Sequence, residues 1–598
     1  MSIVPLDKIT IYGTSNQKAD VLDGLQELGC LHLIALRDVR DGGRELVSKE
    51  AREAYRYLQS CRPSRRKASS KTPYDREQLI RQAIENKQEA ERLVAARDHL
   101  QKAIEDIRVW GEFDLGDVED RVGKPLWFYE IPPHELDVLS DEWVWFIAGR
   151  DNRFAYVVLI ADEPADEIPQ SPVELDRRPL SELKKLLDEA EERLDELHWE
   201  RVGLTRWRRR LKDDLDAADD AAARAAAAEG AFDDQTVFAI QGYVPRVARD
   251  AVVQFADQRN LAVTIEPIAE DELAPTLLHN PKQVAGAENC VTFYITPGYH
   301  SWDPTSVVFF SFSLFFAMIV ADAGYGLVMA IGLCFGWRRL GRDPTTRRMR
   351  SLFTGIVLAT ITYGILVGSY FGVEPGAGTW LDRLRIRIDG KPMMQQQTAM
   401  MVIAVSIGVA HLVMANLISA WHRRRGLRWI GHLGWAMLMI GGFLLGGGVL
   451  ADLSSMAVAG EMMASSGAVA ILLFSSDQAW SWSFGGLAKR LLDGVLQFTN
   501  LSKAFGDVLS YLRLFALGLA SAQLAVTFNA LASETAKKGG IGLLAAILIL
   551  VVGHSINFML GILGGVVHGL RLNCIEFFNW SLNEEGYAFE PFQRKAES

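Results

Sequence analysis

Two long apolar segments near the carboxy terminus each contain an arginine, and they constrain the fold more than any other feature. Residues 502–533 form an apolar run with Arg513 near its middle, and residues 541–571 form a second run that ends at Arg571. About 20 apolar residues cross a bilayer as a helix, so both runs can span it. A guanidinium stays charged at any working pH and is costly in hydrocarbon, so the two runs indicate a polar pathway rather than an anchor.

The rest of the 598-residue chain divides into two unlike halves. Up to about residue 300 it is rich in charged residues and has no run of membrane length, whereas beyond Thr305 it is mostly apolar. The net charge of -11 belongs to the first half and argues against nucleic acid as a partner. No secretory leader opens the sequence, so we expect the first half in the cytoplasm. The five cysteines have no metal-ligand spacing and no disulfide framework, and we predict no metal and no cofactor.

Leucines in the first half follow the alternating three-and-four spacing of a coiled coil over residues 180–215. We predict a helix at 179–229 that packs antiparallel against a charged helix at 73–111. The residues between them, 112–170, contain strand patterns and are expected to form a small distal knob.

Strand–helix–strand patterns occur at both ends of the first half, at 7–36 and at 236–268. No nucleophile with an adjacent base, no phosphate-binding glycine loop and no HExxH motif is present, so we predict a strut and no enzyme activity of its own. The predicted fold is mainly α: an elongated cytoplasmic arm over 1–300, made of two small α/β units and a coiled coil, then a transmembrane domain over 301–598.

The second half is predicted to contain eight transmembrane helices, at 305–320, 324–338, 351–372, 397–420, 428–451, 459–475, 502–533 and 541–571. As one helix, residues 305–338 would be about 50 Å long, so we place a turn in the sequence ADAGYG. With eight helices, the arginine-rich connectors RRLGRDPTTRRMR and WHRRRGLR both lie on the cytoplasmic side, together with both chain ends. The loop 373–396, which contains three arginines, falls on the other side and contradicts this rule.

Several stretches resemble subunit a, called subunit I in bacteria and archaea, of V/A-type rotary ATPases. They are PTLLHNP at 275–281, DPT at 303–305, FFAMIVADAGYG at 315–326, YGILVGSYFGVE at 363–374, LSYLRLFALGLASAQLA at 509–525 and VVHGLRLNCIEFFNWSLNEEGYAFEPF at 566–592. The resemblance implies a membrane stator with two offset half-channels for H⁺ or Na⁺, located in the cell membrane. It also implies several partners: proteolipid ring subunits, peripheral stalk subunits, a central-stalk or ring-cap subunit and membrane lipid.

The resemblance assigns Arg513 to the ion pathway, where a permanent cation would keep an arriving ring carboxylate ionised. The alternative is that Arg513 pairs structurally within the bundle or snorkels to the interface. Arg571 is either a pathway residue or an arginine at the membrane interface. His568, one helical turn before Arg571, is either a proton relay or a hydrogen-bonded structural histidine.

Other polar residues of the membrane half have two open interpretations each. Asp507 either lines the inner half-channel or meets water at the interface, and Asp322 is either an outer-surface carboxylate or part of an outer funnel. A further set either lines the outer path or only forms hydrogen bonds between helices: Ser521, Gln523, Asn529, His554, Ser555 and Asn557.

Three more positions bear on the pathway. Glu576 follows Arg571 by five residues and is predicted to form a local ion pair. Ser521 stands where eukaryotic members of the family have histidine, and Gly561 stands where they have glutamate.

Two other function classes compete with the stator. A secondary ion transporter with a cytoplasmic coiled coil would also have buried charges, but the long strut and the lack of an internal repeat argue against it. A membrane-anchored tether would have no use for two buried arginines.

Overall fold

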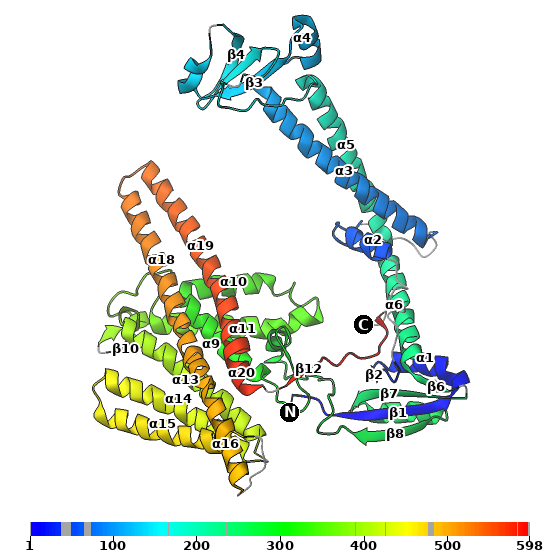
Figure 1. The fold of residues 1–598 in the computed structure, drawn as a ribbon, viewed down its shortest axis with the longest axis vertical. Helices are drawn as coiled ribbons and strands as arrows, with labels where there is room; N and C mark the ends of the chain where they lie inside the picture. Colours follow the sequence, from blue (N-terminus) through cyan, green and yellow to red (C-terminus); the bar gives the residue numbers. More distant parts are fainter. Residues whose placement is uncertain are drawn as a thin grey trace. The chain divides into compact units, whose positions relative to one another are not determined.

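The computed structural model describes residues 2–37, 49–64, 73–140, 142–165, 167–234, 236–388, 390–424, 426–476, 483–582 and 584–595 (Figure 1). The chain forms two compact units. The first comprises 1–12, 30–34 and 240–591, and the second comprises 13–29, 35–239 and 592–598. This division follows contacts, so the functional boundary expected near residue 300 stays a prediction.

The first unit begins with an antiparallel sheet whose strand order differs from the chain order. Its strands follow the order β2-β7-β1-β8, with the bounds β1 (Leu6–Thr14), β2 (His32–Ile34), β7 (Val237–Pro245) and β8 (Ala262–Pro267). Ile9 of β1 lies opposite Ile265 of β8, and Leu33 of β2 lies opposite Gly242 of β7. The two predicted strand–helix–strand segments therefore share one sheet, which the sequence pattern did not predict. Helix α7 (Arg249–Gln258) connects β7 to β8.

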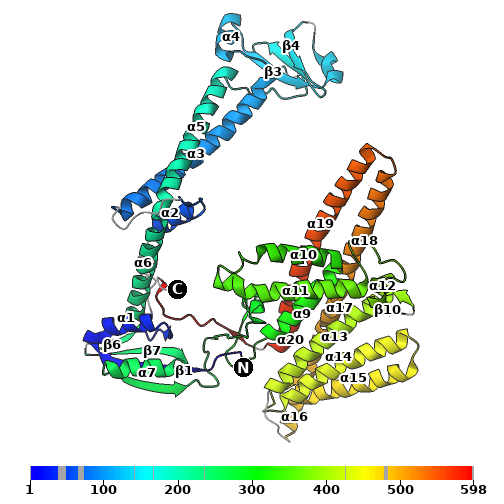
Figure 2. The same cartoon turned by 180° about the vertical axis from the view of Figure 1, so that it is seen from behind.

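Helices dominate the second unit. They are α1 (Lys18–Leu28), α2 (Lys49–Gln59), α3 (Arg76–Arg108), α5 (Leu180–Leu204) and α6 (Arg208–Gly230). Helices α3 and α5 lie side by side (Figure 2) and run antiparallel. Near one end Ile107 packs against Leu183, and further along Asn86 donates a hydrogen bond to the carbonyl of Leu197 at 3.1 Å.

The predicted helix at 179–229 is interrupted. A short 3₁₀ segment, η4 (Thr205–Trp207), separates α5 from α6. Trp207 is buried there with Leu79 of α3 and with Leu211 and Leu215 of α6. The bulky indole is thus part of the core at the break between the two helices.

The distal knob is a three-stranded sheet with the order β3-β5-β4. Its elements are α4 (Leu115–Val122), β3 (Leu126–Ile131), η3 (Pro133–Val138), β4 (Val144–Arg150) and β5 (Ala155–Ile160). The edge strand β4 was not predicted. Its side chains alternate between exposed and half-buried, as expected for a strand with one covered face.

Long apolar helices make up most of the first unit. Among the described residues six helical stretches are long and apolar enough to cross a membrane: α11 (Pro344–Val367), α13 (Gln397–His422), α14 (Arg428–Leu450), α15 (Ser454–Phe474), Phe484–Ala536 and Ile541–Ser581. Two of the eight predicted spans, α9 (Thr305–Val320) and α10 (Ala323–Gly336), are apolar but shorter. The count of eight transmembrane helices therefore stays a prediction.

The last two stretches are composite. The first contains α16 (Phe484–Phe498), α17 (Asn500–Ser510) and α18 (Leu512–Ala536). The second contains α19 (Ile541–Arg571), the π-helix η7 (Leu572–Phe577) and α20 (Phe578–Ser581). Shorter elements complete the chain: η1 (Ser15–Gln17), β6 (Phe232–Asp234), η5 (Ala285–Ala287), α8 (Glu288–Thr292), β9 (Thr296–Pro297), α12 (Trp380–Leu384), β10 (Arg387–Ile388), β11 (Lys391–Pro392), η6 (Met393–Gln395) and β12 (Glu585–Gly586).

The predicted turn between α9 and α10 is confirmed. Ala321 adopts a left-handed conformation, φ 49°, and Asp322 caps the start of α10. Helix α11 packs against both helices. Phe309 of α9 lies beside Gly355 of α11, and the carbonyl of Trp337, just beyond α10, accepts a hydrogen bond from Arg350 of α11. Both the start of α9 and the end of α10 therefore lie near the start of α11.

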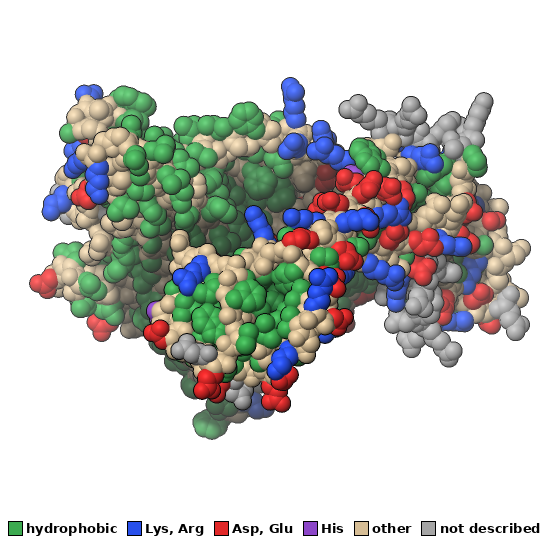
Figure 3. Space-filling model, turned by 90° about the horizontal axis from the view of Figure 1, so that it is seen from above, with side chains coloured by type: hydrophobic (Ala, Val, Ile, Leu, Met, Phe, Trp, Pro, Cys, Tyr) green, Lys and Arg blue, Asp and Glu red, His purple; other side chains and the backbone are tan. Residues whose placement is uncertain are grey.

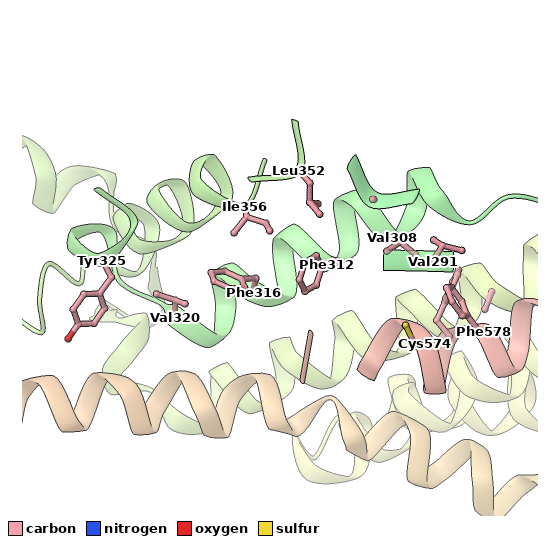
Figure 4. Close-up of a cluster of buried hydrophobic side chains, with 13 residues drawn as sticks. Val291, Val308, Phe312, Phe316, Val320, Tyr325, Leu352, Ile356, Cys574 and Phe578 are labelled. Carbon is pink, nitrogen blue, oxygen red and sulfur yellow. The ribbon is translucent and has the colours of Figure 1, made fainter. Parts of the chain in front are cut away.

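The core of this unit forms around α9. Phe312 and Phe316 of α9 pack with Leu352 and Ile356 of α11 and with Cys574 of η7 (Figure 4). Many other apolar side chains of the long helices are exposed. In the space-filling view, hydrophobic side chains form broad areas with few charged side chains among them (Figure 3). Such areas are expected of a surface that faces lipid.

The arginine-rich connectors lie at one end of the helix bundle. Arg348 of the first connector forms an ion pair with Glu288 at 3.6 Å. Ser419, near the end of α13, donates a hydrogen bond to the carbonyl of Trp580 at 2.8 Å. In the loop 373–396, Arg385 and Arg387 both pair with Asp382, at 2.6 and 2.7 Å. The arginines that contradicted the charge rule are thus partly neutralised within their own loop.

Candidate functional site

Arg513 lies at the junction of two helices rather than in the middle of one. Helix α17 ends at Ser510, and α18 begins at Leu512 after a turn at Tyr511. The side chain is half-buried, and its Nη1 atom is buried without a hydrogen-bond partner among the described residues. An arginine nitrogen without a hydrogen-bond partner is costly in an apolar helix pair.

Arg571 is the last residue of α19, and the π-helix η7 follows it directly. Its Nε atom lies 3.9 Å from Oε1 of Glu576, which confirms the predicted ion pair. In an α-helix, two residues five apart point about 140° away from each other. The π-helix joins residues i and i+5, so it brings this pair onto one side. Glu576 is only 2% exposed, and its Oε2 atom has no hydrogen-bond partner in the part of the chain that is described.

Two further titratable side chains, His568 and Glu576, lie near these arginines. Arg513 interacts electrostatically with Arg571 and with Glu576, and His568 interacts with both arginines. The Nδ1 atom of His568 is buried and accepts or donates no hydrogen bond within the described residues. The group contains two permanent cations against one buried carboxylate. We call Arg513, Arg571, His568 and Glu576 the arginine cluster.

An aromatic support that the sequence did not reveal lies behind Arg513. Tyr511 is fully buried, and its hydroxyl lies 2.7 Å from Nδ1 of His411 in α13. The imidazole of His411 stacks on Phe577 of η7, with ring centroids 4.3 Å apart. This packing links α13, η7 and the start of α18. In the sequence, the signal for this contact is a lone histidine, His411, in the apolar run 397–420.

Close backbone contacts hold α18 in place. A Cβ atom added at Gly408 of α13 would lie 2.5 Å from the ring of Tyr511. One added at Gly518 of α18 would lie 2.6 Å from the carbonyl oxygen of Met318 in α9. Small residues at these two positions therefore allow α13 and α9 to approach α18 directly.

Asp507 lies on α17, towards the same end of the bundle as Trp580. Its carboxylate accepts a hydrogen bond from Nε1 of Trp580 at 2.7 Å. The side chain is half-buried, so it is neither free in water nor enclosed. It also interacts electrostatically with Glu576 of the arginine cluster.

A second polar group lies farther along α18 and α19. The amide of Asn557 donates hydrogen bonds to the hydroxyl of Tyr325 at 3.0 Å and to the carbonyl of Ser521 at 2.9 Å. The Tyr325 hydroxyl also lies 2.8 Å from Nδ1 of His554, whose Nε2 lies 3.0 Å from the side-chain oxygen of Asn529. We call these five residues the outer polar chain. It joins α10, α18 and α19, and four of its five members were predicted candidates.

Asp322 is buried at the base of this chain, so the outer-surface alternative is wrong. It is 3% exposed, because its carboxylate is enclosed by donors. It accepts hydrogen bonds from the backbone N–H groups of Tyr325, Phe371 and Gly372 at 3.0, 2.9 and 3.0 Å, and from the hydroxyl of Ser369 at 2.6 Å. The carboxylate thus caps α10 and anchors the end of α11.

The remaining candidates lie outside this chain. Gln523 is exposed on α18 and shares a helix face with Arg513, because the residues 513, 516, 520, 523 and 527 are spaced by three and four. Ser555 is exposed on α19. Gly561, where the family resemblance would place glutamate, faces Val320, whose Cγ2 lies 3.8 Å from an added Cβ. That position is packed against α9.

The long apolar helices and the buried polar residues between them fit a multi-pass membrane protein. Comparison with known proteins adds a similarity to one family. Residues 505–594, which contain the arginine cluster, match the V-type ATPase 116kDa subunit family.

Known proteins that match over more of the chain are named as V-type or A-type ATP synthase subunits. The V-type ATP synthase subunit I of Chlamydia trachomatis is 26% identical and covers 99% of this chain and 98% of its own length. The A-type ATP synthase subunit I of Methanocaldococcus jannaschii is 28% identical over 61% of this chain and 56% of its own length. This chain is thus similar to subunit I of V-type and A-type ATP synthases.

A solved structure also matches part of the chain. It is the crystal structure of the cytoplasmic N-terminal domain of subunit I, homolog of subunit a, of V-ATPase. The match covers 43% of this chain and 99% of that chain, at 18% identity and a TM-score of 0.22. That score is too low to carry an argument about the fold.

Proposed function

We propose that this chain is the membrane stator of a V/A-type rotary ATPase and forms two offset half-channels for H⁺ or Na⁺. The observation that carries the proposal is the arginine cluster on α18, α19 and η7, in the segment that matches the family. Here two cations and one carboxylate lie among exposed apolar helix faces.

The role proposed for Arg513 follows from its charge. A proteolipid carboxyl that reaches a fixed guanidinium is held ionised, since a pair of unit charges 4 Å apart gains about 4 kcal/mol at an effective dielectric constant of about 20. The ring carboxyl must then release its ion on one side and take up another on the other side. The same cation opposes leakage of H⁺ or Na⁺ directly between the half-channels. The Arg513 side chain is only half-buried, and it shares a helix face with exposed residues of α18, which suits this contact.

The face of α18 around Arg513 suits a rotating partner. Ala516 and Ala520 are exposed on this face, followed by Gln523 and Thr527. Side chains this small allow another helix to approach closely and to move past without interlocking. We propose that this stripe, together with α19, faces the proteolipid ring.

The other polar residues divide between the two half-channels in this proposal. Asp507 lines the inner one, with His568 and Arg571 beside it. The outer polar chain, including Ser521, belongs to the outer one. Asp322 does not exchange ions, because all of its acceptor positions are used, and it acts by fixing Tyr325 and the 369–372 segment.

The second unit and the connectors suggest the remaining partners. The paired helices α3 and α5 form a strut that suits attachment to peripheral stalk subunits, and the same arm would meet a central-stalk or ring-cap subunit. Arg348 of the first connector pairs with Glu288, and the ring of His422 in the second lies beside Trp302, so both connectors lie near residues 276–303. We therefore place the N-terminal half and the carboxy terminus in the cytoplasm, with the chain in the cell membrane and no catalytic site of its own.

Cysteine crosslinking in the assembled complex tests this arrangement. Cys334 is exposed and is first replaced by serine. Ala520→Cys on α18 should then crosslink to the proteolipid ring on mild oxidation with a ring cysteine, whereas the matched exposed control Leu358→Cys on α11 should not. Crosslinks from position 358 and none from position 520 would refute the proposed ring face.

A further inference from the structure

The helix that carries Arg513 is irregular two residues before the arginine. At Tyr511 the backbone hydrogen bonds span three residues instead of four. The N–H of Tyr511 donates to the carbonyl of Val508 at 3.2 Å, and the N–H of Leu514 donates to the carbonyl of Tyr511 at 3.0 Å. Such tight turns inside a helix often mark hinges, and they rotate the residues that follow relative to a regular α-helix. The direction of the Arg513 side chain therefore depends on how this turn is held.

A second irregular turn carries the acidic member of the arginine cluster. The π-helix η7 begins directly after Arg571, contains Glu576 and ends at Phe577. π-Helical turns are rare, and they are found frequently at functional sites. The placement of Glu576 beside Arg571 therefore depends on what holds the end of η7, at Phe577.

One imidazole contacts both irregular turns. Nδ1 of His411 lies 2.7 Å from the hydroxyl of Tyr511, and the same ring stacks on Phe577 with centroids 4.3 Å apart and planes 11° apart. Phe315 of α9 lies edge-on to His411 and to Tyr511, with centroids 5.2 and 5.7 Å apart. All four side chains are buried. The positions of the two turns are thus linked through His411.

Packing alone does not account for a histidine at this position. The Nε2 atom of His411 is buried and has no hydrogen-bond partner in the part of the chain that is described. An unsatisfied nitrogen in an apolar core lowers stability, and a phenylalanine would stack on Phe577 without that cost. What the histidine adds is the hydrogen bond with Tyr511.

We propose that His411 is a positioning residue of the arginine cluster. It fixes both the turn that directs Arg513 and the π-helix that holds Glu576 beside Arg571. This inference rests on the proposed stator function, because it explains how the two arginines keep the spacing that ion transfer needs. His411 itself contacts neither the ion nor the ring carboxyl. A misplacement of about 1 Å at a reacting group can cost about a hundredfold in rate, so a small shift of Arg513 is enough to impair transfer.

The first experiment removes both hydrogen-bonding partners together. In His411→Phe/Tyr511→Phe the two rings remain and neither position keeps a buried polar group, so the complex should assemble and unfold as the wild type does. ATP-driven H⁺ or Na⁺ uptake by vesicles, expressed per intact complex, should fall about tenfold or more. A merely structural defect would reduce the number of complexes and leave the uptake of each one unchanged. Tyr363→Phe, in the same apolar core, is the matched control and should pump normally.

A distance measurement tests the positioning without any transport. The full-length chain is studied in detergent with the exposed Cys334 replaced by serine. Spin labels on Phe505→Cys in α17 and Val526→Cys in α18, both exposed positions, report the angle between the two helices across the turn. The distance distribution should shift or broaden in the double variant and stay as in the wild type in the control.

Arg513→Ala, measured beside these variants, separates the two claims. If Arg513→Ala abolishes uptake while the double variant pumps as the wild type does, the stator proposal stands and the role of His411 is overturned. If Arg513→Ala pumps normally, the stator proposal fails, and the spin-label distances alone decide whether His411 positions the turn. An unchanged distance distribution, or a double variant that does not assemble, would overturn the inference in either case.

Discussion

Asp322 provides a test of how the base of the outer polar chain is held together. Its carboxylate satisfies three backbone N–H groups and one hydroxyl from two separate parts of the chain. Asp322→Ala removes all four acceptor contacts. The hydroxyl of Ser369 can turn elsewhere, but the N–H groups of Tyr325, Phe371 and Gly372 cannot. Each buried donor without a partner costs about 1 kcal/mol or more, so Asp322→Ala should lower the local stability of this region by about 3 kcal/mol.

Asp322→Asn should be intermediate. The amide keeps the shape of the side chain and one acceptor oxygen, which can serve Tyr325 and Phe371. Its NH₂ group then faces the N–H of Gly372, so about one donor loses its partner and the cost is about 1–2 kcal/mol. The expected order of stability is Asp, then Asn, then Ala.

Asp343 is a matched control, because it caps α11 in the same way but is exposed. Its carboxylate accepts hydrogen bonds from the N–H groups of Thr345 and Thr346. Water can replace an exposed cap, so Asp343→Ala should cost about 0.5–2 kcal/mol. Hydrogen exchange measured by mass spectrometry on the full chain reports both sites. Exchange at residues 369–373 should rise about a hundredfold in Asp322→Ala, since 1.36 kcal/mol is a factor of ten. A rise below about threefold, or equal effects at the two caps, would refute this account.

Two further predictions concern packing and charge. Gly408→Ala should displace Tyr511 and lower the free energy of unfolding by about 1–3 kcal/mol, because its Cβ would lie 2.5 Å from the ring. Gly442→Ala in α14 meets nothing within 4 Å and should be neutral, and thermal unfolding compares the two variants. In the second unit, Arg178 hydrogen-bonds to Asp176 and holds the pKa of that carboxyl at about 2, below its usual 3.8. The pair therefore stabilises the folded state above pH 3.8 and loses this contribution as the pH falls through 2. Asp176→Asn should accelerate local hydrogen exchange at neutral pH, and its difference from the wild type should shrink in acid.

The sequence predicted those features that depend on local pattern. Apolar runs of membrane length gave the long helices, and the break at Ala321 and Asp322 followed from the length limit of a membrane span. Leucine spacing gave the segment that packs against α3. Helix α16 was missed because its leucines alternate with Lys489, Arg490 and Asp493, so it has no uniform apolar run. Strand β4 was missed although its alternation was visible.

The site was only partly predictable, because its geometry depends on contacts far apart in the chain. Arg513, Arg571 and His568 stand out as charged or titratable groups in apolar helices. The π-helix that turns Glu576 towards Arg571 has no reliable sequence signal. The support of Tyr511 by His411 joins residues about a hundred positions apart, and the pairing appears only when α13 packs beside α18.

The central claim is that Arg513 performs ion transfer and does not hold the fold together. The direct measurement is ATP-driven H⁺ or Na⁺ uptake by vesicles that contain the whole complex, with subunit content checked in the same vesicles. Arg513→Ala and Arg513→Lys should both abolish uptake while the complex stays assembled, because alanine removes the charge and lysine loses the planar fork and can release its proton. The control Arg424→Ala, an exposed arginine outside the cluster, should pump normally. Normal uptake by Arg513→Ala, or loss of the complex before loss of transport, would contradict the claim.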